Sequence, residues 1–504
     1  MANILIIGGG VAGLSAGIYA QMDGHRAVIC EKQPVAGGNL TGWRRGDCRI
    51  DNCIHWLTGT NPASPLYKMW VDLGALGDGV AIHRADSLYT CEKDGETLSL
   101  WRDLDRLERT MIALSPDDRR EIRRMTRAIR AIQDFCSVGG PDHNGKMGPG
   151  TLGGIPQILR YNRMTTGDLA KRFRHPLIRA FLTDFLTDRF SSLAYFFVAA
   201  HFCGDNADIP VGGSVPMAER MVARFRELGG ELLTGKEAVR IRREGDRATA
   251  VEFRDGTVAT ADEIVVTTDP ATVFPALLDC PMPKGLAARY RHPRMMRFSS
   301  WHCAFVCDRP DEVRFSGDTA WEPSPAVAFR LGSPTVLLRE LSHDPGSAPA
   351  GKCLLQTMIP CDEDAARRFI DLRKDPAAYA RRKQYLAKWT ARAIAERFPA
   401  LEGHLTCLDV WTPATYQRYV GSEIGSFMSF AFGARVLPLR ASDRVPGVVN
   451  VTLATQWLRA PGGLPIAAES GMKAIRTITA RYRRALRRER KALPPTVAAD
   501  TAAR

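Results

Sequence analysis

Hydrophobic and polar positions at the start of the chain follow the order strand, helix, strand. Residues 4–7 are aliphatic without interruption, which predicts a buried strand that ends at the following glycines. A helical pattern occupies residues 11–22, and a second short apolar run at 27–30 ends at Glu31. Two strands joined through a helix form a parallel β-α-β unit, so the sequence predicts one in this region.

The next part of the chain, from about residue 86, is typical of helices rich in arginine. Ser115 and Pro116 mark a helix start, and an apolar stripe follows them. Glycine and proline are frequent at 139–156, which predicts a loop. Helical patterns then follow at 167–189 and 190–203.

The segment 190–204 contains no Asp, Glu, Lys or Arg and is the most continuously apolar run of the chain. A helix that is apolar on all sides is buried in a core or lines an apolar cavity, and both interpretations are open here. Its 15 residues are fewer than the roughly 18–20 that a helix needs to cross a bilayer, so we do not expect it to span a membrane.

The second half of the chain predicts a helix, then strands, then helices again. A helical pattern at 217–228 precedes the strands, and Asp255-Gly256 indicates a hairpin among them. The strand patterns lie at 238–241, 248–253, 263–266, 300–307, 325–332 and 353–359. We expect the last three to form a separate antiparallel sheet, and helical sequence fills about 363–399.

Charge changes this picture only near the C-terminal end. The chain has 69 Lys and Arg and 55 Asp and Glu, a net charge of +14, of which the segment 473–491 supplies +8. Within it Ile478, Tyr482 and Leu486 form one helical face flanked by arginines. Two interpretations are open: the helix lies on an anionic membrane surface, or it packs this face on the protein with its arginines in solvent. Residues 491–504 are expected to be a disordered tail.

Composition narrows the class of protein. With 45% hydrophobic and 25% charged residues the chain is typical of globular proteins, and no nucleic-acid-binding module accompanies its basic segment, so we expect no nucleic acid partner. The 12 cysteines form no CxxC pair, which predicts free thiols in a reducing cytosol and no metal site. The first strand directly follows Met1-Ala2-Asn3, without room for an export signal, so we expect a cytoplasmic protein, with peripheral membrane attachment as an alternative.

The glycines after the first strand carry the clearest chemical signal. Gly8, Gly10 and Gly13 match G-x-G-x-x-G between a predicted strand and a predicted helix, and Glu31 ends the next strand 18 residues after Gly13. In such a loop the first glycine permits the tight turn, the second lets the backbone approach a pyrophosphate, and the third lets helix and strand pack closely. The carboxylate of Glu31 would accept hydrogen bonds from ribose hydroxyls. The pattern therefore predicts a dinucleotide site, and FAD and NAD both fit it at this point.

A second glycine pair bears on that choice. Lys32 follows Glu31, and Gly37, Gly38 and Asn39 come about six residues further along. Here the chain resembles the FAD-dependent phytoene desaturase-like family of the amine oxidase-type flavoprotein superfamily, whose members continue E-K-x-x-x-x-G-G-R. Asn39 stands in place of the arginine, which weakens one phosphate contact that the resemblance implies. No second G-x-G-x-x-G follows a strand, so a separate NAD(P) domain is not expected.

Three further parts of the chain resemble the same family. The segment 50–56, which contains His55, is similar to the family's F-D-x-G-x-H motif. Val239 lies in the region whose strand backbone holds the adenine in relatives. Gly462, Gly463 and Leu464 belong to a closing motif whose glycines let the backbone approach the flavin ring, with the positive end of the following helix directed at it.

The resemblance implies a glutathione-reductase-like FAD-binding domain of the Rossmann-like α/β class, non-contiguous in sequence, with an inserted α+β substrate-binding domain. The expected boundaries are 1–85, 205–298 and 405–490 for the FAD-binding domain, and 86–204 and 299–404 for the substrate-binding domain.

The implied activity is that of an oxidoreductase with non-covalently bound FAD. The enzyme would desaturate or saturate a carbon–carbon bond of a lipophilic, polyene or isoprenoid substrate, with hydride transfer at flavin N5. Two alternatives stay open: a double-bond isomerase without net redox change, and amine oxidation at a C–N bond. His55 is the one candidate catalytic residue, with a hydrogen-bonding role as its alternative. Trp457 and Arg459 are candidates for the walls of the flavin pocket.

Overall fold

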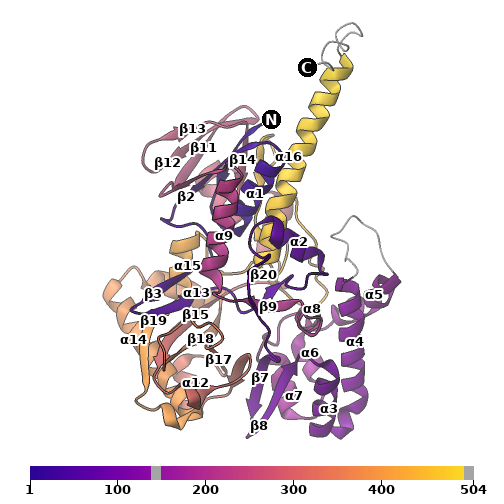
Figure 1. Ribbon diagram of the computed structural model, residues 1–504, viewed down its shortest axis with the longest axis vertical. Coiled ribbons are helices and arrows are strands. Elements are labelled where there is room, and N and C mark those ends of the chain that lie inside the picture. The colour runs from indigo at the N-terminus through magenta and orange to yellow at the C-terminus, as the bar shows by residue number, and fades with distance from the viewer. Residues whose placement is uncertain (138–148, 493–504) are drawn as a thin grey trace.

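A five-stranded parallel sheet forms the centre of one lobe, at the top of Figure 1. The computed structural model describes residues 1–137 and 149–492. The strand order is β10-β2-β1-β14-β21. The strands are β1 (Asn3–Ile7), β2 (Arg26–Glu31), β10 (Glu231–Thr234), β14 (Glu263–Val266) and β21 (Val451–Leu453). The central strands are almost entirely buried, since both faces of the sheet are covered, as is usual for parallel sheets.

Helices cover one face of this sheet. They are α1 (Val11–Met22), α9 (Ser214–Glu227) and α16 (Leu464–Ala492). Helices α1 and α16 touch backbone to backbone, because a Cβ on Gly471 would lie 2.3 Å from the carbonyl oxygen of Ala12. Ser15 Oγ also donates to the carbonyl of Ala468 at 2.6 Å. The C-terminal turns of α16 extend beyond the lobe (Figure 1).

The other face carries a small antiparallel sheet and short helices. These elements are β11 (Ala238–Glu244), β12 (Arg247–Phe253), β13 (Val258–Ala259), α10 (Pro270–Val273), a π-helical turn (Phe274–Leu278) and α11 (Lys284–Arg291). Their apolar side chains, Val251 and Phe274 among them, share a core with Leu5, Ile7 and Val266 of the parallel sheet.

A larger, eight-stranded sheet forms the lower half of the molecule (Figure 1). Its order is β19-β15-β18-β17-β16-β7-β8, and β20 pairs with β15. The strands are β7 (Ser87–Lys93), β8 (Glu96–Trp101), β15 (Met295–Cys307), β16 (Asp318–Trp321), β17 (Val336–Glu340), β18 (Cys353–Asp362), β19 (Leu405–Trp411) and β20 (Phe430–Phe432). Helices α12 (Pro325–Leu331), α13 (Glu363–Leu372) and α14 (Pro376–Arg397) accompany it, and Leu386 and Ile394 of α14 pack into the core of this sheet.

A helical lobe continues from strands β7 and β8, at the lower right of Figure 1. Its helices are α3 (Leu104–Leu114), α4 (Arg119–Ser137), α5 (Pro149–Tyr161), α6 (Thr166–Ala170), α7 (Pro176–Thr183) and α8 (Ser192–Cys203). Fully buried aromatic side chains, including Tyr89, Phe181 and Phe196, join the helices to β7.

Short elements connect the lobes. They are the hairpin β3 (Gly42–Arg45) with β4 (Cys48–Asp51), the strands β5 (Leu57–Thr58), β6 (Ile82–His83) and β9 (Ala207–Pro210), and the helices α2 (Pro65–Asp72) and α15 (Pro413–Val420). Asp51 anchors this region, since its carboxylate accepts from the backbone N–H of Cys53, Ile54 and Ser214 at 2.6–3.1 Å. Four 3₁₀ turns, at 116–118, 310–313, 399–401 and 456–458, complete the described elements.

The structure confirms the N-terminal β-α-β unit and most of the later strands. The predicted strands at 238–241, 248–253 and 263–266 are β11, β12 and β14, and those at 300–307 and 353–359 are parts of β15 and β18. The helical patterns at 217–228 and 363–399 correspond to α9 and to α13 with α14.

Four predictions were wrong in part or in whole. Residues 325–331 are helix α12 rather than a strand, because Pro325 occupies the first turn and Gly332 ends the helix at φ +71°. Residues 149–156 belong to α5 rather than to a loop, and the rest of the predicted loop, 138–148, lies outside the described residues. The segment 167–189 is divided between α6 and α7, since Pro176 starts a new helix.

The fourth correction concerns a domain boundary. Strand β19, at 405–411, belongs to the lower sheet, although 405–490 was assigned to the FAD-binding domain. Its partner is β15, about a hundred residues earlier in the chain, and sequence patterns do not show such a long-range pairing. Of the tail predicted at 491–504, residues 493–504 lie outside the described residues.

The C-terminal stripe packs on the protein. Ile478 is fully buried in the core of the upper lobe, and Tyr482 packs against the same core with its ring 5.9 Å from that of His25. Leu486 is 52% exposed. Arg481 forms an ion pair with Glu263 of β14. Two of the three stripe residues are therefore covered by protein and are not free to enter a membrane. No helix within the described ranges is long and apolar enough to span a bilayer.

Candidate active site

A cavity of about 1970 Å³ lies between the two large sheets. Its lining includes the glycine loop after β1 at one side and helix α8 at another. Residues from both sheets and from the connecting segments complete the wall. A single continuous space thus joins the predicted dinucleotide site to the predicted apolar channel.

The loop after β1 has the geometry that its glycines predict. Gly8 adopts φ +103°, which L side chains rarely adopt. A Cβ on Gly13 would lie 1.9 Å from the carbonyl oxygen of Gly8, so this glycine permits the contact of helix and turn and does not itself line the cavity. Gly10 has ordinary extended angles, φ −73° and ψ −178°, and lines the cavity.

Helix α1 directs free backbone donors into this cavity. Gly10 is its N-cap residue, and among the described residues no side chain caps the first turn. Val11 and Ala12 of that turn line the cavity. The N–H groups of a first helical turn have no partner within the helix, and together with the helix dipole they favour an anion such as a pyrophosphate.

Glu31 lies at the end of β2 and is 6% exposed. Its carboxylate accepts from the N–H of Gly9 at 2.7 Å and from the N–H of Gln33 at 2.8 Å. Burial raises the pKa of Glu31, and the two N–H donors oppose that shift. A carboxylate has about four acceptor positions, so the group retains capacity for ribose hydroxyls in the cavity that it lines.

The second glycine turn lies directly against the first. Gly37 N–H donates to the carbonyl of Gly9 at 2.8 Å, and a Cβ on Gly10 would lie 3.7 Å from Gly38 Cα. Asn39 Nδ2 donates to the carbonyl of Phe427 at 3.0 Å, whereas its buried Oδ1 has no partner among the described residues. Gly37, Gly38 and Asn39 all line the cavity, so this unpaired acceptor belongs to its wall.

Two of the predicted cofactor contacts, Lys32 and Val239, differ in their relation to the cavity. Lys32 lines the cavity, but its ammonium donates to the carbonyl of Arg418 at 3.0 Å, and burial lowers its pKa. Val239 does not line the cavity, whereas its neighbour Ala238 does, together with Lys236 and Glu237. The predicted adenine contact is with the strand backbone at Val239, and it stays a prediction.

The C-terminal glycines form the opposite wall. Gly462 and Gly463 have φ +83° and +89°, and the N–H of Gly463 donates to Gln456 Oε1 at 2.8 Å. Leu464, the first residue of α16, lines the cavity with both glycines. Trp457 and Arg459 also line it, as the sequence indicated, and Arg459 pairs with Glu469 at 3.1 Å.

These residues fit FAD. Gly10, Gly37 and Gly38 line the cavity without side chains that would keep a phosphate away, the uncapped first turn of α1 supplies donors, and Glu31 supplies acceptors. The glycine pair before α16 lets a flat ring approach the backbone, and the positive end of that helix faces the same space. These are the groups that suit a dinucleotide whose ring becomes negatively charged when it is reduced.

His55 lines the cavity and belongs to a row of three polar side chains, with Asp318 and Arg339. Its Nδ1 is 3.0 Å from Asp318 Oδ2, and Asp318 Oδ1 is 3.4 Å from Arg339 Nε. Burial acts to raise the pKa of Asp318, but Arg339 and the contact with His55 outweigh it and hold the pKa below its usual value. Next to them His302 Nε2 lies 2.6 Å from Ser300 Oγ, and burial lowers the pKa of His302 strongly.

Helix α8 presents one face to the cavity, which confirms that the segment 190–204 borders it. The lining residues recur at helical spacing: Leu193, Ala194, Phe197, Val198 and His201. The opposite face, with Tyr195, Phe196 and Phe202, is buried in the core of the helical lobe. Both interpretations of this segment therefore hold, one for each face. Burial lowers the pKa of His201 to about 4, so this face is uncharged at neutral pH.

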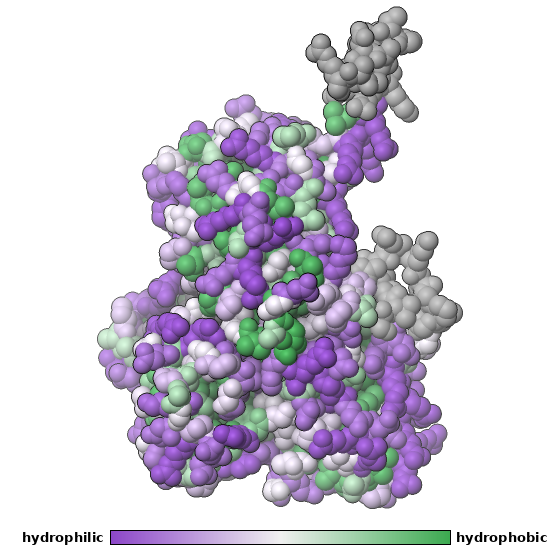
Figure 2. Space-filling model, in the orientation of Figure 1, coloured by the Kyte–Doolittle hydropathy of each residue, from purple (hydrophilic) through white to green (hydrophobic). Residues whose placement is uncertain are grey.

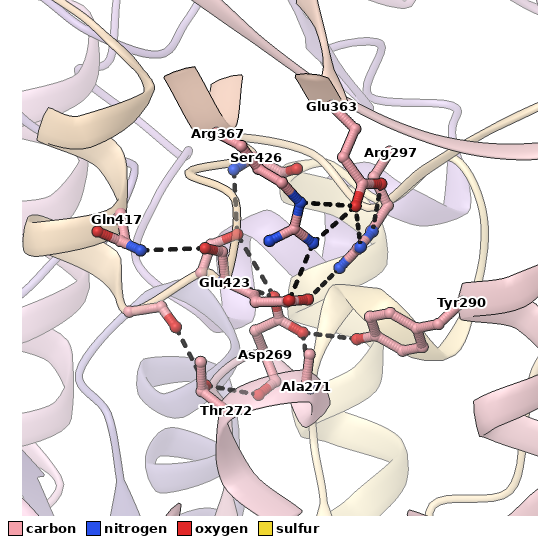
Figure 3. A network of polar contacts seen from close by, with 12 residues as sticks. Asp269, Ala271, Thr272, Tyr290, Arg297, Glu363, Arg367, Gln417, Glu423 and Ser426 are labelled. Atoms are coloured by element: carbon pink, nitrogen blue, oxygen red, sulfur yellow. Dashed lines mark hydrogen bonds and ion pairs between the residues drawn. The ribbon is translucent and has the colours of Figure 1, made fainter. Parts of the chain in front are cut away.

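A second polar network joins the lobes beside the cavity (Figure 3). Arg297 of β15 forms ion pairs with Glu363 of α13 and with Glu423, which follows α15. The backbone N–H of Glu423 donates to Asp269 Oδ2 at 3.0 Å, and Tyr290 Oη is 2.5 Å from Asp269 Oδ1. Burial raises the pKa of Asp269, although these donors oppose the shift.

The sequence indicated His55 but neither its partners Asp318 and Arg339 nor the network around Arg297. Asp318, Arg339 and Arg297 lie on strands that are adjacent only after folding, and β16 and β17 were not predicted. The alternation Ser300, His302 within an otherwise apolar run was the one available signal, since residues two apart share a face. No group of three or more His, Cys, Asp or Glu side chains within the described part of the chain is placed to hold a metal ion.

The fold and this site are those of a dinucleotide-dependent oxidoreductase. A family model described as flavin containing amine oxidoreductase matches residues 11–479. The chain belongs to this family, and it is a FAD-dependent oxidoreductase. The resemblance seen in the motifs is thereby confirmed.

Individual relatives are distant. A phytoene desaturase (lycopene-forming) of Paracoccus sp. (strain N81106 / MBIC 01143) is 22% identical, over 84% of this chain and 86% of the relative. A 4,4'-diapolycopene oxygenase of Methylomonas sp is 23% identical over 93% and 96%. Among solved structures, cyclohexylamine oxidase from Brevibacterium oxydans IH-35A has a TM-score of 0.57 at 14% identity, covering 96% of this chain and 99% of its own. The structural likeness shows the shared fold.

Proposed function

We propose that the protein desaturates or saturates a carbon–carbon bond of a lipophilic isoprenoid or polyene substrate. The observation that carries the proposal is the continuity of the cavity: the apolar face of α8 opens into the same space as the glycine turns. An extended hydrophobic chain on this face would place one of its bonds near the flavin. The names of the two relatives, a phytoene desaturase and a 4,4'-diapolycopene oxygenase, support this substrate class.

Different residues of this chain would bind the cofactor and orient the substrate. FAD, when bound, supplies two-electron chemistry by accepting a hydride. The first turn of α1 and the turn at Gly37 and Gly38 would hold the pyrophosphate, and Glu31 the ribose. The face of α8 with Phe197 and Val198 would orient the substrate and exclude water from it. We propose that FAD is held without a covalent bond, which release of yellow cofactor on acid or heat denaturation would test.

The experiment is anaerobic mixing of the yellow holoenzyme with a polyene substrate. Desaturation bleaches the yellow absorbance of the oxidised flavin and yields a product lighter by two hydrogens. An isomerase would give a product of unchanged mass without bleaching. The amine oxidase alternative is tested in parallel with a primary alkylamine. Bleaching by the amine and not by the polyene would contradict the proposal.

We also propose that the protein attaches peripherally to an anionic membrane through the mouth of the cavity. Leu437 and Leu439, which line the cavity, are 50% and 66% exposed. Arginines surround them: Arg435 and Arg440 flank the pair, and Arg289 Nη2 donates to the carbonyl of Leu439 at 2.7 Å. Exposed apolar side chains with cationic neighbours match a bilayer with anionic headgroups. Hydrophilic residues cover much of the face seen in Figure 2, with hydrophobic residues gathered near its centre.

Vesicle co-sedimentation tests this attachment. Binding to phosphatidylserine-containing vesicles is expected to fall with salt and to weaken in a Leu437→Asp/Leu439→Asp variant. Phe329→Asp is the matched control, because Phe329 is 82% exposed and does not line the cavity. Equal sedimentation of all three proteins would contradict attachment at the cavity mouth.

A further inference from the structure

One end of the cavity is polar, although the proposed substrate is lipophilic. We call this group the polar subsite: His55, Ser300, His302, Asp318, Arg339 and Tyr416. All of them except Arg339 line the cavity. They come from the segment after β4, from β15, β16 and β17, and from α15, so the fold assembles them from five separate parts of the chain.

Within the polar subsite, Asp318 fixes the tautomer of His55. Asp318 Oδ2 lies 3.0 Å from His55 Nδ1, and a carboxylate held by Arg339 can only accept a hydrogen bond. The proton of a neutral imidazole is therefore on Nδ1, and Nε2 carries the lone pair. Arg339 is itself fixed, since its Nη2 donates to the carbonyl of Ile54 at 2.6 Å, directly before His55 in the chain.

The other members of the polar subsite already bond to each other. His302 Nε2 lies 2.6 Å from Ser300 Oγ and 3.1 Å from Tyr416 Oη. The ring of His302 stacks on Trp411, with centroids 4.7 Å apart and planes 1° from parallel. Tyr416 Oη also accepts from Trp411 Nε1 at 3.1 Å. These contacts make this part a rigid wall and leave His55 Nε2 as the acceptor without a partner among the described residues.

The unpaired His55 Nε2 would oppose the binding of a pure hydrocarbon in this cavity. The side chain of His55 is 24% exposed and that of Asp318 only 11%, so His55 is the member of the pair that opens into the cavity. A hydrocarbon would displace water from Nε2 and leave a buried acceptor unpaired, which opposes binding. A ligand with a hydrogen-bond donor near its apolar chain would remove this penalty.

We propose that the polar subsite binds the hydroxyl group of a lipophilic alcohol, which donates its O–H to His55 Nε2 while its chain lies along the apolar wall. Asp318 and Arg339 are positioning residues, because they keep the lone pair of His55 directed at the ligand. The inference rests on the proposed function, which it narrows from lipophilic substrates in general to those with a hydroxyl group. It concerns binding and needs no redox step.

The test compares two ligands that differ only in the donor. Geranylgeraniol and its methyl ether share the same chain, and the ether has no O–H to donate. Dissociation constants are measured by titration calorimetry with the oxidised holoenzyme in matched detergent micelles. We expect the alcohol to bind about tenfold more tightly than the ether. This is the scale of the free energy lost when a buried acceptor is left without its hydrogen bond.

Variants then assign the preference to His55. In His55→Phe we expect the alcohol and the ether to bind equally, whereas His55→Gln keeps an acceptor and retains part of the preference. The matched control is His404→Phe: His404 Nδ1 lies 2.8 Å from Asp308 Oδ1, so it is also a His–Asp pair, but it does not line the cavity. FAD content is recorded for each variant to confirm that the site is intact.

Equal binding of alcohol and ether to the unaltered protein, no binding of either, or an unchanged ratio in His55→Phe would each overturn the inference. The outcome is separable from that of the proposed function, because calorimetry does not require turnover. A preference for the alcohol without flavin bleaching by any polyene would keep the polar subsite and refute the proposed chemistry.

Discussion

The substitution Gly10→Ala tests whether this glycine is needed to bind FAD and not to fold the protein. Gly10 has φ −73° and ψ −178°, which an alanine adopts without strain. The added Cβ would lie 3.7 Å from Gly38 Cα, an ordinary van der Waals contact. It would stand in the cavity wall beside the first turn of α1, where we place the pyrophosphate. The substitution is thus harmless to the protein alone and harmful to its complex with FAD.

The expected magnitudes follow from these two facts. Without FAD, replacing glycine by alanine at compatible angles reduces the entropy of the unfolded chain and stabilises the protein by about 0.4–1 kcal/mol. With FAD, loss of a charge-assisted hydrogen bond to phosphate weakens binding by about 10- to 100-fold. At an FAD concentration about 100 times the dissociation constant, the cofactor adds about 2.7 kcal/mol to the stability of the original protein. After a hundredfold loss of affinity it would add only about 0.4 kcal/mol.

Thermal unfolding with and without added FAD measures both effects on the same samples. The variant is expected to unfold at the same or a higher temperature than the original protein without FAD, and at a lower one with FAD. Gly10→Val should extend the effect and yield colourless protein. If Gly10→Ala binds FAD with unchanged affinity, the pyrophosphate does not lie beside Gly10 and our placement of the cofactor is wrong. If the variant is less stable than the original protein without FAD, the added Cβ does not fit beside Gly38 without strain.

Three other substitutions test further parts of the structure. Gly13→Ala places a Cβ 1.9 Å from a backbone oxygen, and we expect a loss of about 3 kcal/mol or more, measured by urea denaturation without FAD. Arg297→Met leaves Glu363 and Glu423 with Arg367, which pairs with both at 2.7 and 3.1 Å. Because the two carboxylates are also 35% and 36% exposed, we expect a loss of about 1–2 kcal/mol, between the values for exposed and for buried pairs, with Arg297→Lys losing less. Burial raises the pKa of Asp184 to about 6, so the folded state holds this proton more tightly than the unfolded chain, and stability falls as pH rises from about 4 to 6. Asp184→Asn should therefore gain about 3 kcal/mol over the original protein at pH 8 and little near pH 3, as followed by denaturation at both pH values.

The parts of the fold that sequence predicted best are those with local signals. The β-α-β unit around Gly8 and Gly13 was predictable because its glycines, helix and terminal acid lie within about thirty residues, as the dinucleotide motif requires. The helix at 325–331 was missed because its short apolar run has no polar alternation, and length alone does not separate strand from helix in such runs. The membership of 405–411 in the lower sheet depended on a partner strand far away in the chain.

The same distinction applies to the site. The cofactor side was predicted because each glycine has its own backbone requirement, visible in one position of the sequence. Val239 stays a prediction, since only the resemblance pointed to it and no local feature of the sequence fixes which residue of the strand meets the adenine. Asp318 and Arg339 could not be predicted, because a carboxylate and a guanidinium acquire their role only when neighbouring strands align.

The contacts between the upper lobe and the lower sheet affect the geometry of the site, because residues of both line the cavity. The glycine turns belong to the upper lobe and the polar subsite to the lower sheet, so the distance between flavin and substrate depends on how the lobes are held. The network in Figure 3 joins them: Arg297 lies on the lower sheet, while Asp269 directly follows the end of the parallel sheet and binds the backbone of Glu423. Arg297 is only 8% exposed on its side chain, and a buried cation tolerates little displacement from its two carboxylates. Because a buried ion pair adds little net stability, we infer that this network serves to hold the two lobes in one relative position.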